Sequence, residues 1–240
     1  PAYMMEIYAG VLEQTDYNVG RVLDAIEGLG QLDNTLVIYI VGDNGASAEG
    51  WPQGMLNELA GVNGLAEDYQ QVLARKDELG TWKTHNHYPS AWAHAMDTPF
   101  QWTKQIASHY GGTRNAMVIS WPARIKDRGG LRAQWHHTID IVPTILDVTG
   151  LQQPSIVNGV VQKPIEGVCL AYTVDDSKAE SVRRSQNLEL IGTRGSYHDR
   201  WVPCTTPVIY SLEPVEFNTA VISGDWWVIY HVAAEFSEAV

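Results

Sequence analysis

Apolar positions near the start of the chain first follow the period of a helix and then form an unbroken run. Residues 4–29 carry apolar side chains every three to four positions, which predicts an amphipathic helix that ends at Gly28 and Gly30. Residues 36–41, rich in Val and Ile, predict a strand that is buried on both faces. A helix followed by a buried strand is typical of an α/β sheet with helices on its faces.

Shorter patterns follow along the chain. Residues 46–99 predict a long connection with one helical piece, at about residues 66–79. Residues 116–121 predict a second buried strand, and residues 135–150 a helix with a kink or a restart at Pro143. Residues 151–185 are typical of a loop, whereas residues 188–204 and 225–232 alternate in the manner of antiparallel strands.

A polar run at residues 175–185 is the expected boundary between two units. Residues 1–180 would form the main α/β part, and residues 181–240 a small antiparallel subdomain appended to it.

Aromatic side chains gather in and just after the long connection, and two interpretations stay open. They could line a pocket for a ring-bearing substrate, or they could form the connection's own core. The residues concerned are Trp51, Trp82, Tyr88, Trp92 and Trp102.

The overall charge narrows the classes of partner. The chain has 240 residues and a net charge of −12, which argues against a nucleic-acid or membrane-surface partner. No apolar run reaches the roughly 18 residues of a membrane-spanning helix. Cys169 and Cys204 lack a C-x-x-C spacing, so one disulfide or two buried thiols both remain open. The compartment and the oligomeric state are not predicted.

Asp43 and Asn44 directly follow the first predicted strand. Ligands in open α/β sheets gather at the carboxyl ends of strands, and adjacent carboxylate and amide oxygens suit a hard cation such as Ca²⁺ or Mg²⁺. Because Asp-Asn-Gly is also common in plain turns, a purely conformational role stays open.

Lys104 precedes a Gly111-Gly112 turn and Arg114. A lysine beside such a turn can reach an anion held over the sheet, although a solvated lysine is the usual alternative. For Arg114 we favour a structural ion pair. The adjacent His136 and His137 lack the spacing of a zinc site, which favours structural roles for both.

Taken together, these residues resemble the arylsulfatase family of the alkaline-phosphatase superfamily, in its central and C-terminal portions. The family pattern is a buried strand ending in D-N-G, a later lysine, and G-G-x-R leading into a strand closed by W-P. Its counterparts here are Asp43-Asn44-Gly45, Lys104, Gly111-Gly112-Thr113-Arg114 and Trp121-Pro122. The resemblance extends over residues 3–201.

The resemblance implies a fold. The fold would be α/β: an alkaline-phosphatase-like sandwich of a mixed sheet with helices on both faces, plus a small C-terminal antiparallel sheet. The N-terminal half of that domain would be missing from this chain.

The resemblance also implies a chemistry, the hydrolysis of a sulfate monoester of a small molecule or a sugar. A divalent cation, usually Ca²⁺, would neutralise the sulfate oxygens, and a formylglycine made from a cysteine in C-x-[PA]-x-R would be the nucleophile. Asp43 and Asn44 would be metal ligands. Lys104 would contact the sulfate as a catalytic and substrate-binding residue.

Several parts of the family pattern are absent from these 240 residues. Cys169 is followed by Leu-Ala-Tyr and Cys204 by Thr-Thr-Pro, so neither fits the nucleophile motif. The paired aspartates that complete the metal site, and the Lys and His residues that protonate the leaving group, are missing as well. We therefore expect the formylglycine upstream of this chain and no turnover by the chain alone. A phosphonate or phosphate ester hydrolase of the same superfamily, or a non-catalytic truncated product, are the alternatives.

Overall fold

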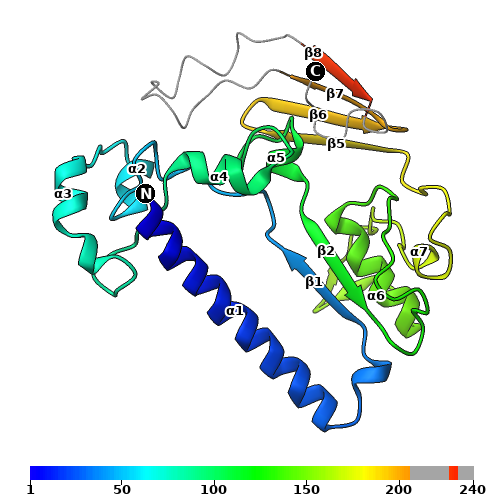
Figure 1. The fold of residues 1–240 in the computed structure, drawn as a ribbon. Coiled ribbons are helices and arrows are strands. Elements are labelled where there is room, and N and C mark those ends of the chain that lie inside the picture. Colours follow the sequence, from blue (N-terminus) through cyan, green and yellow to red (C-terminus); the bar gives the residue numbers. More distant parts are fainter. Residues whose placement is uncertain (206–226, 232–240) are drawn as a thin grey trace.

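The computed structural model describes residues 1–205 and 227–231 as an assembly of helices and small antiparallel sheets (Figure 1). The α/β class predicted from the sequence is confirmed. The mixed sheet covered by helices on both faces is not seen within these residues, because each sheet found there has antiparallel neighbours throughout.

The first element, α1 (Ala2–Gly28), confirms the predicted N-terminal helix. It runs from the region of α2 and α4 to the short 3₁₀ helix η1 (Leu32–Asn34), which leads into the first strand (Figure 1). Met4 is its one buried residue within the part of the chain described, while Val11 and Val22 are 53% and 60% exposed. Met4 apart, the predicted apolar stripe is half-buried or exposed along its whole length. Nowhere in residues 1–205 or 227–231 is a helix long and apolar enough to cross a bilayer.

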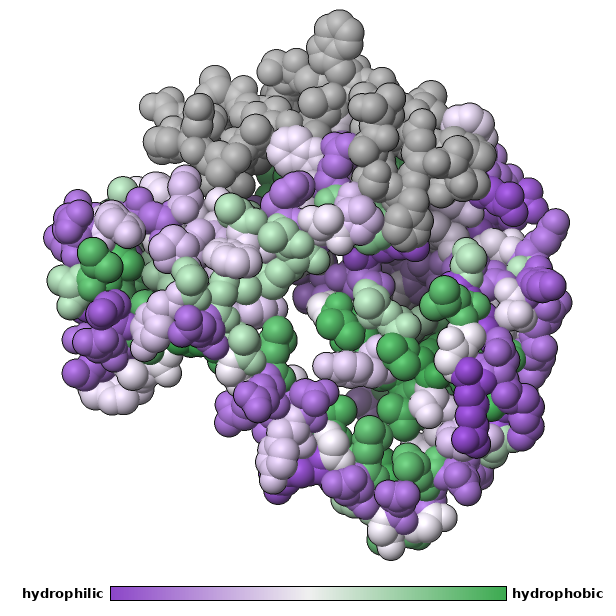
Figure 2. All heavy atoms as spheres, viewed as in Figure 1, coloured by the Kyte–Doolittle hydropathy of each residue, from purple (hydrophilic) through white to green (hydrophobic). Residues whose placement is uncertain are grey.

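The two predicted apolar strands pair with each other. β1 (Val37–Val41) and β2 (Ala116–Ser120) run antiparallel, with Tyr39 opposite Val118. Both strands were predicted correctly, but their burial was not, because Val41 is 49% and Val118 60% exposed. Both faces of this two-stranded sheet carry exposed apolar side chains, and apolar residues gather in this region of the surface (Figure 2).

The connection after β1 holds more helix than its sequence suggested. It contains α2 (Glu58–Val62), α3 (Tyr69–Ala74), the 3₁₀ helix η2 (Lys76–Glu78) and α4 (Ser90–Asp97). The predicted piece at residues 66–79 corresponds to α3 and η2, so the expectation of a single helical piece was wrong. α2 and α4 are short and depend on local signals: the Asn57 side chain caps α2, and Pro89 precedes α4.

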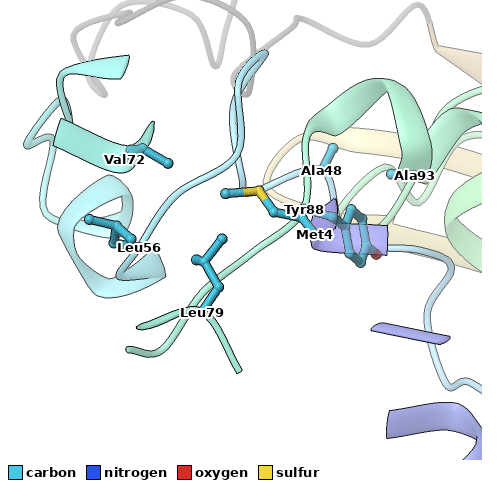
Figure 3. Packing of buried hydrophobic residues seen from close by; sticks show 7 residues of the cluster. All are labelled: Met4, Ala48, Leu56, Val72, Leu79, Tyr88 and Ala93. Atoms are coloured by element: carbon cyan, nitrogen blue, oxygen red, sulfur yellow. The ribbon is translucent and has the colours of Figure 1, made fainter. Parts of the chain in front are cut away.

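A small core lies within this connection and is shown in Figure 3. It joins Met4 of α1 to residues from the connection, namely Ala48, Leu56, Val72, Leu79, Tyr88 and Ala93. The connection therefore has a core of its own. Of the five aromatic residues named in the sequence analysis, Tyr88 alone belongs to this core, and Trp82 is 91% exposed.

The kink or restart predicted at Pro143 corresponds to a change of helix type just before that residue. The 3₁₀ helix η3 (Thr138–Asp140) leads directly into α6 (Ile141–Thr149). Pro143 lies in the first turn of α6, where a missing N–H breaks no intrahelical hydrogen bond. Gly150 ends the helix with φ of 70°, a left-handed conformation that glycine adopts without strain. The helical pattern from residue 135 was thus predicted three residues too early.

The remaining elements follow the predicted order. The loop after α6 contains a short hairpin, β3 (Ile156–Val157) and β4 (Val160–Val161), and a turn of helix, α7 (Tyr172–Asp175). A four-stranded antiparallel sheet follows, in the order β5 (Ser185–Leu190), β6 (Thr193–His198), β7 (Trp201–Thr205) and β8 (Trp227–His231). Residues 225, 226 and 232 of the last predicted strand lie outside the described residues. The division into units 1–180 and 181–240 stays a prediction.

Candidate functional site

Two glycines shape the turn that follows β1. Gly42 and Gly45 have φ values of 81° and 79°, and Asp43 and Asn44 lie between them. The Gly45 N–H donates to the Asn115 Oδ1 at 3.1 Å. A Cβ added to Gly45 would lie 1.8 Å from the carbonyl oxygen of Gly111. Glycine at this position therefore allows the turn to rest directly on the backbone of α5 (Tyr110–Thr113).

The Gly111-Gly112 pair has the same steric role toward the segment that carries Lys104. A Cβ on Gly111 would lie 2.0 Å from the Trp102 carbonyl oxygen, and one on Gly112 would lie 2.1 Å from that of Ile106. Larger residues would push the two segments apart. The glycine-rich part of the sequence pattern thus brings three separate segments together: the turn after β1, the approach to α5, and α5 itself.

Asp43 and Asn44 border an open hollow of about 2060 Å³. Residues 112–122 and 127–138 form two continuous stretches of its lining. Asp43 is exposed and Asn44 half-buried. Within the part of the chain that the structure describes, neither side chain makes a hydrogen bond or an ion pair, so their oxygen atoms are free to bind a ligand.

This donor set fits a hard cation as a part of its coordination shell. Asp43 and Asn44 offer carboxylate and amide oxygens, the ligand types that Ca²⁺ and Mg²⁺ prefer. Residues 1–205 and 227–231 contain no group of three or more His, Cys, Asp or Glu side chains that could hold a metal ion. The two residues can therefore supply only a fraction of the six to eight oxygens that Ca²⁺ takes.

Lys104 adjoins the same turn through its backbone and turns its side chain to a carboxylate. Its N–H donates to the Ala46 carbonyl oxygen at 3.0 Å. Its Nζ donates to Glu49 Oε2 at 2.7 Å, and its side chain is 31% exposed. Lys104 is therefore ion-paired rather than simply solvated. Within the described residues, no hydrogen bond joins its side chain to Asp43 or Asn44.

Three side chains around Lys104 were not singled out from the sequence: Glu49, Ser47 and His87. Glu49 also binds Gln105 and Ser47, and Ser47 in turn contacts the His87 Nε2 at 2.8 Å. Only the tertiary structure brings His87 to this place, because it lies 40 residues from Ser47 in the sequence. Glu49 follows the D-N-G motif closely, and this proximity is the one signal that could have drawn attention to it.

Asp97, at the end of α4, fixes the turn from the other side. Its carboxylate oxygens accept the Ala46 N–H at 3.0 and 3.3 Å. Burial raises the pKa of Asp97 above its ordinary value, although this hydrogen bond partly offsets the effect. Ala46 thus binds Asp97 through its N–H and Lys104 through its carbonyl.

The other candidate residues have structural surroundings. The Arg114 guanidinium lies 4.9 Å from the ring centroid of Phe100 and 5.4 Å from that of Tyr110, a cation–π arrangement that the sequence did not suggest. His136 Nδ1 lies 3.1 Å from Asp140 Oδ2, and its Nε2 lies 3.1 Å from the Tyr172 hydroxyl. The structural interpretation of His136 is confirmed by these contacts.

Cys169 and Cys204 form no disulfide, and Cys204 is buried whereas Cys169 is half-buried. The open question of a disulfide is thereby answered, and the expectation of two buried thiols holds for Cys204 alone.

Comparison with known proteins agrees with this arrangement. The model of the Sulfatase family matches residues 2–151. The chain is 31% identical to an uncharacterized sulfatase of Schizosaccharomyces pombe. The match extends over 153 residues, which are 64% of this chain and 26% of that protein. It is 25% identical over 170 residues to an arylsulfatase of Klebsiella aerogenes, covering 71% of this chain and 34% of that protein. The chain thus spans about a quarter to a third of the length of these relatives.

Proposed function

Because the chain belongs to the sulfatase family, we propose that it forms part of an enzyme that hydrolyses sulfate monoesters of the arylsulfatase type. The observation that carries the proposal is the position of Asp43 and Asn44. Their side chains lack described partners at the end of β1, border an open hollow, and adjoin the segment that bears Lys104.

Each residue has a separate role in this proposal. Asp43 and Asn44 would hold a divalent cation, Ca²⁺ or alternatively Mg²⁺, together with ligands from outside the described residues. When bound, the cation would supply positive charge that neutralises the sulfate oxygens. Lys104 would donate hydrogen bonds to the same sulfate and would supply local positive charge in a chain whose net charge is −12.

The nucleophile would come from outside these 240 residues. The family's formylglycine arises from a cysteine in C-x-[PA]-x-R, and neither Cys169 nor Cys204 lies in such a motif. We therefore expect no turnover of a sulfate ester by the 240 residues alone. The substrate would be a sulfate ester of a small molecule or of a sugar.

The same proposal extends to the fold. The exposed apolar residues of β1 and β2 support the placement of this strand pair in a larger mixed sheet, with helices on both faces of a sandwich. A crystal structure of the complete protein would test this layout, and a complete protein in which both faces of β1 and β2 stay open to solvent would contradict it.

The metal role is tested in the complete protein that carries this chain. Asp43→Ala should remove the bound calcium, measured by elemental analysis, and with it the turnover of a chromogenic aryl sulfate. Asp24→Ala, at an exposed position of α1, is the matched control and should change neither quantity. Normal turnover and normal calcium content in Asp43→Ala would refute the metal assignment.

The sulfate role of Lys104 is tested by kinetics. Lys104→Ala should lower kcat/KM for the aryl sulfate, because it removes a charged contact with the group that reacts. An unchanged kcat/KM would exclude the role. A higher kcat/KM of the unmodified protein for a matched phosphate or phosphonate ester would support the alternative chemistry of the same superfamily.

A further inference from the structure

Glu49 stands at the centre of a set of polar contacts beside Lys104. Its Oε2 accepts from the Lys104 Nζ at 2.7 Å and from the Ser47 hydroxyl at 2.6 Å, and its Oε1 accepts from the Gln105 Nε2 at 2.7 Å. The Glu49 and Lys104 side chains are only 24% and 31% exposed. Three donors from two segments of the chain thus hold one carboxylate in place.

Behind Ser47 the contacts continue into the core of the connection. The Ser47 Oγ lies 2.8 Å from the Nε2 of His87, a buried residue whose Nδ1 lies 2.8 Å from the Tyr88 carbonyl oxygen. A carbonyl oxygen can only accept, so Nδ1 carries the proton of this hydrogen bond. The contact fixes the orientation of the His87 ring, which directs its Nε2 at the Ser47 Oγ.

The backbone next to Glu49 is fitted to the same histidine. A Cβ added to Gly50 would lie 1.9 Å from the Tyr88 carbonyl oxygen and 2.6 Å from the His87 Nδ1. Only glycine lets the chain approach this closely. Glu49 therefore projects from a backbone that cannot shift toward His87, which limits the positions its carboxylate can take.

The charge state of Glu49 is consistent with a fixed ion pair. Burial alone would raise the pKa of Glu49, but the hydrogen bonds from Lys104 and Ser47 outweigh it and keep the pKa below its ordinary value. The side chain is thus a carboxylate at neutral pH and acts only as an acceptor.

We propose that Glu49 is a positioning residue for Lys104, and that Ser47 and His87 hold Glu49 in the place this requires. Lysine has a long flexible side chain whose charge otherwise samples many positions. Pairing one of its N–H groups with a fixed carboxylate leaves the others for a sulfate oxygen at a defined site. The inference rests on the role of Lys104 proposed above.

Charge alone would predict the opposite effect of Glu49. A carboxylate that holds the ammonium group could compete with the sulfate for it, in which case its removal would increase activity. The three converging donors and the buried histidine favour positioning, because a competing group has no need of such support.

A double-mutant cycle on the complete protein tests the inference. Glu49→Gln should lower kcat/KM for the aryl sulfate by about 10- to 100-fold, the range found when a group that orients a metal ligand is removed. In a Lys104→Ala background the same change should alter kcat/KM by less than about twofold, because nothing is left to position. A merely structural role of Glu49 would persist in that background.

Two further variants keep the test conclusive. Ser47→Ala should lower kcat/KM by a few fold, and this effect too should vanish in the Lys104→Ala background. The Ser47→Ala variant therefore tests the inference even if Glu49→Gln folds poorly. Glu67→Gln is the matched control, since Glu67 accepts the backbone N–H groups of Leu56 and Asn57 in the same connection without contacting Lys104. It should leave kcat/KM unchanged in both backgrounds.

The outcomes separate the two proposals. The positioning role alone would be overturned if Lys104→Ala lost activity while the effects of Glu49→Gln and Lys104→Ala were additive in the double mutant. A gain of activity in Glu49→Gln would also overturn it. An unchanged kcat/KM in Lys104→Ala would overturn the role of Lys104 and the positioning role with it.

Discussion

At the scale of single residues, Asp140 is the most constrained carboxylate described. It is completely buried, and its oxygens accept from the Arg183 guanidinium, from the His137 N–H at 2.9 Å and from the Val168 N–H at 2.8 Å. These contacts tie the start of α6 to the segment before α7 and to the start of the C-terminal sheet. A buried pair of this kind is costly to break, because the remaining partner stays buried with its charge uncompensated.

We predict that Asp140→Asn destabilises the protein by roughly 3 kcal/mol or more, the usual cost of breaking a buried ion pair. Urea-induced unfolding would measure the loss. Asp175→Asn is the matched control, because the ion pair of Asp175 with Arg124 lies at the surface. The urea midpoint of this variant should stay near that of the unmodified protein. Equal midpoints for the two variants would contradict the special role of Asp140.

Asp140 also predicts a dependence of stability on pH. Burial alone would raise its pKa, but the hydrogen bonds from Arg183 and the backbone outweigh it and lower the pKa from 3.8 to about 2. The folded state therefore binds the proton less readily than the unfolded state does. The stabilisation is fully present above pH 4 and declines as the pH falls from about 4 toward 2. The slope of unfolding free energy against pH in this window should be smaller in Asp140→Asn, and an identical slope would contradict the assignment.

At the scale of elements, the long helix α1 packs against the core of the connection through its first two turns. Met4 enters the core of the connection, and a Cβ added to Gly54 would lie 2.3 Å from its sulfur. Met4→Ala should therefore lower the unfolding free energy by about 2–5 kcal/mol, as other large-to-small changes in cores do. Val11→Ala, at an exposed position of the same helix, should have little effect. Comparable losses in the two variants, measured by chemical denaturation, would show that α1 is anchored elsewhere.

The contact between α5 and the turn after β1 gives a second prediction at this scale. Gly111→Ala places a methyl group within 2.0 Å of a backbone oxygen and should destabilise the protein. It should also reduce the aryl sulfate turnover that we propose for the complete protein. Gly10→Ala, at an open position of α1 where an added Cβ would meet nothing within 4 Å beyond the neighbouring helix backbone, should instead stabilise slightly, because alanine favours helix more than glycine does. Thermal unfolding of both variants, beside the turnover assay, distinguishes a steric effect from a general intolerance of substitutions at glycine.

The sequence revealed the long, strongly patterned elements and missed the short ones. α1, β1, β2 and the C-terminal strands each carry enough periodic positions to be recognised. α2 and α4 are too short for that, and they owe their formation to capping and to the packing of Ala93. Asp43, Asn44 and Lys104 could be named because they lie in short motifs. Glu49 and His87 could not be paired, because their association depends on how the connection folds back on itself.

At the scale of the whole molecule, large apolar areas are exposed. They include Leu12 and Val22 on α1, the faces of β1 and β2, and the β3–β4 hairpin, where Val161 is 76% exposed. Surfaces of this extent and open strand edges favour association.

We predict that the 240 residues expressed alone self-associate at micromolar concentration. Size-exclusion chromatography with light scattering would measure the distribution of masses. Val118→Glu, on the exposed face of β2, should shift this distribution toward the monomer, whereas Glu67→Gln should not. A clean monomer of the unmodified chain would contradict the prediction.

The hydrogen bond between the Lys104 N–H and the Ala46 carbonyl oxygen has one more consequence. It closes the base of the connection, so the chain leaves at Ala46 and returns at Lys104 at nearly the same point. Natural insertions or deletions beyond that closed base would leave Asp43, Asn44 and Lys104 where they are. The connection can therefore diverge in length among descendants, provided that Ser47, Glu49 and His87 are inherited together.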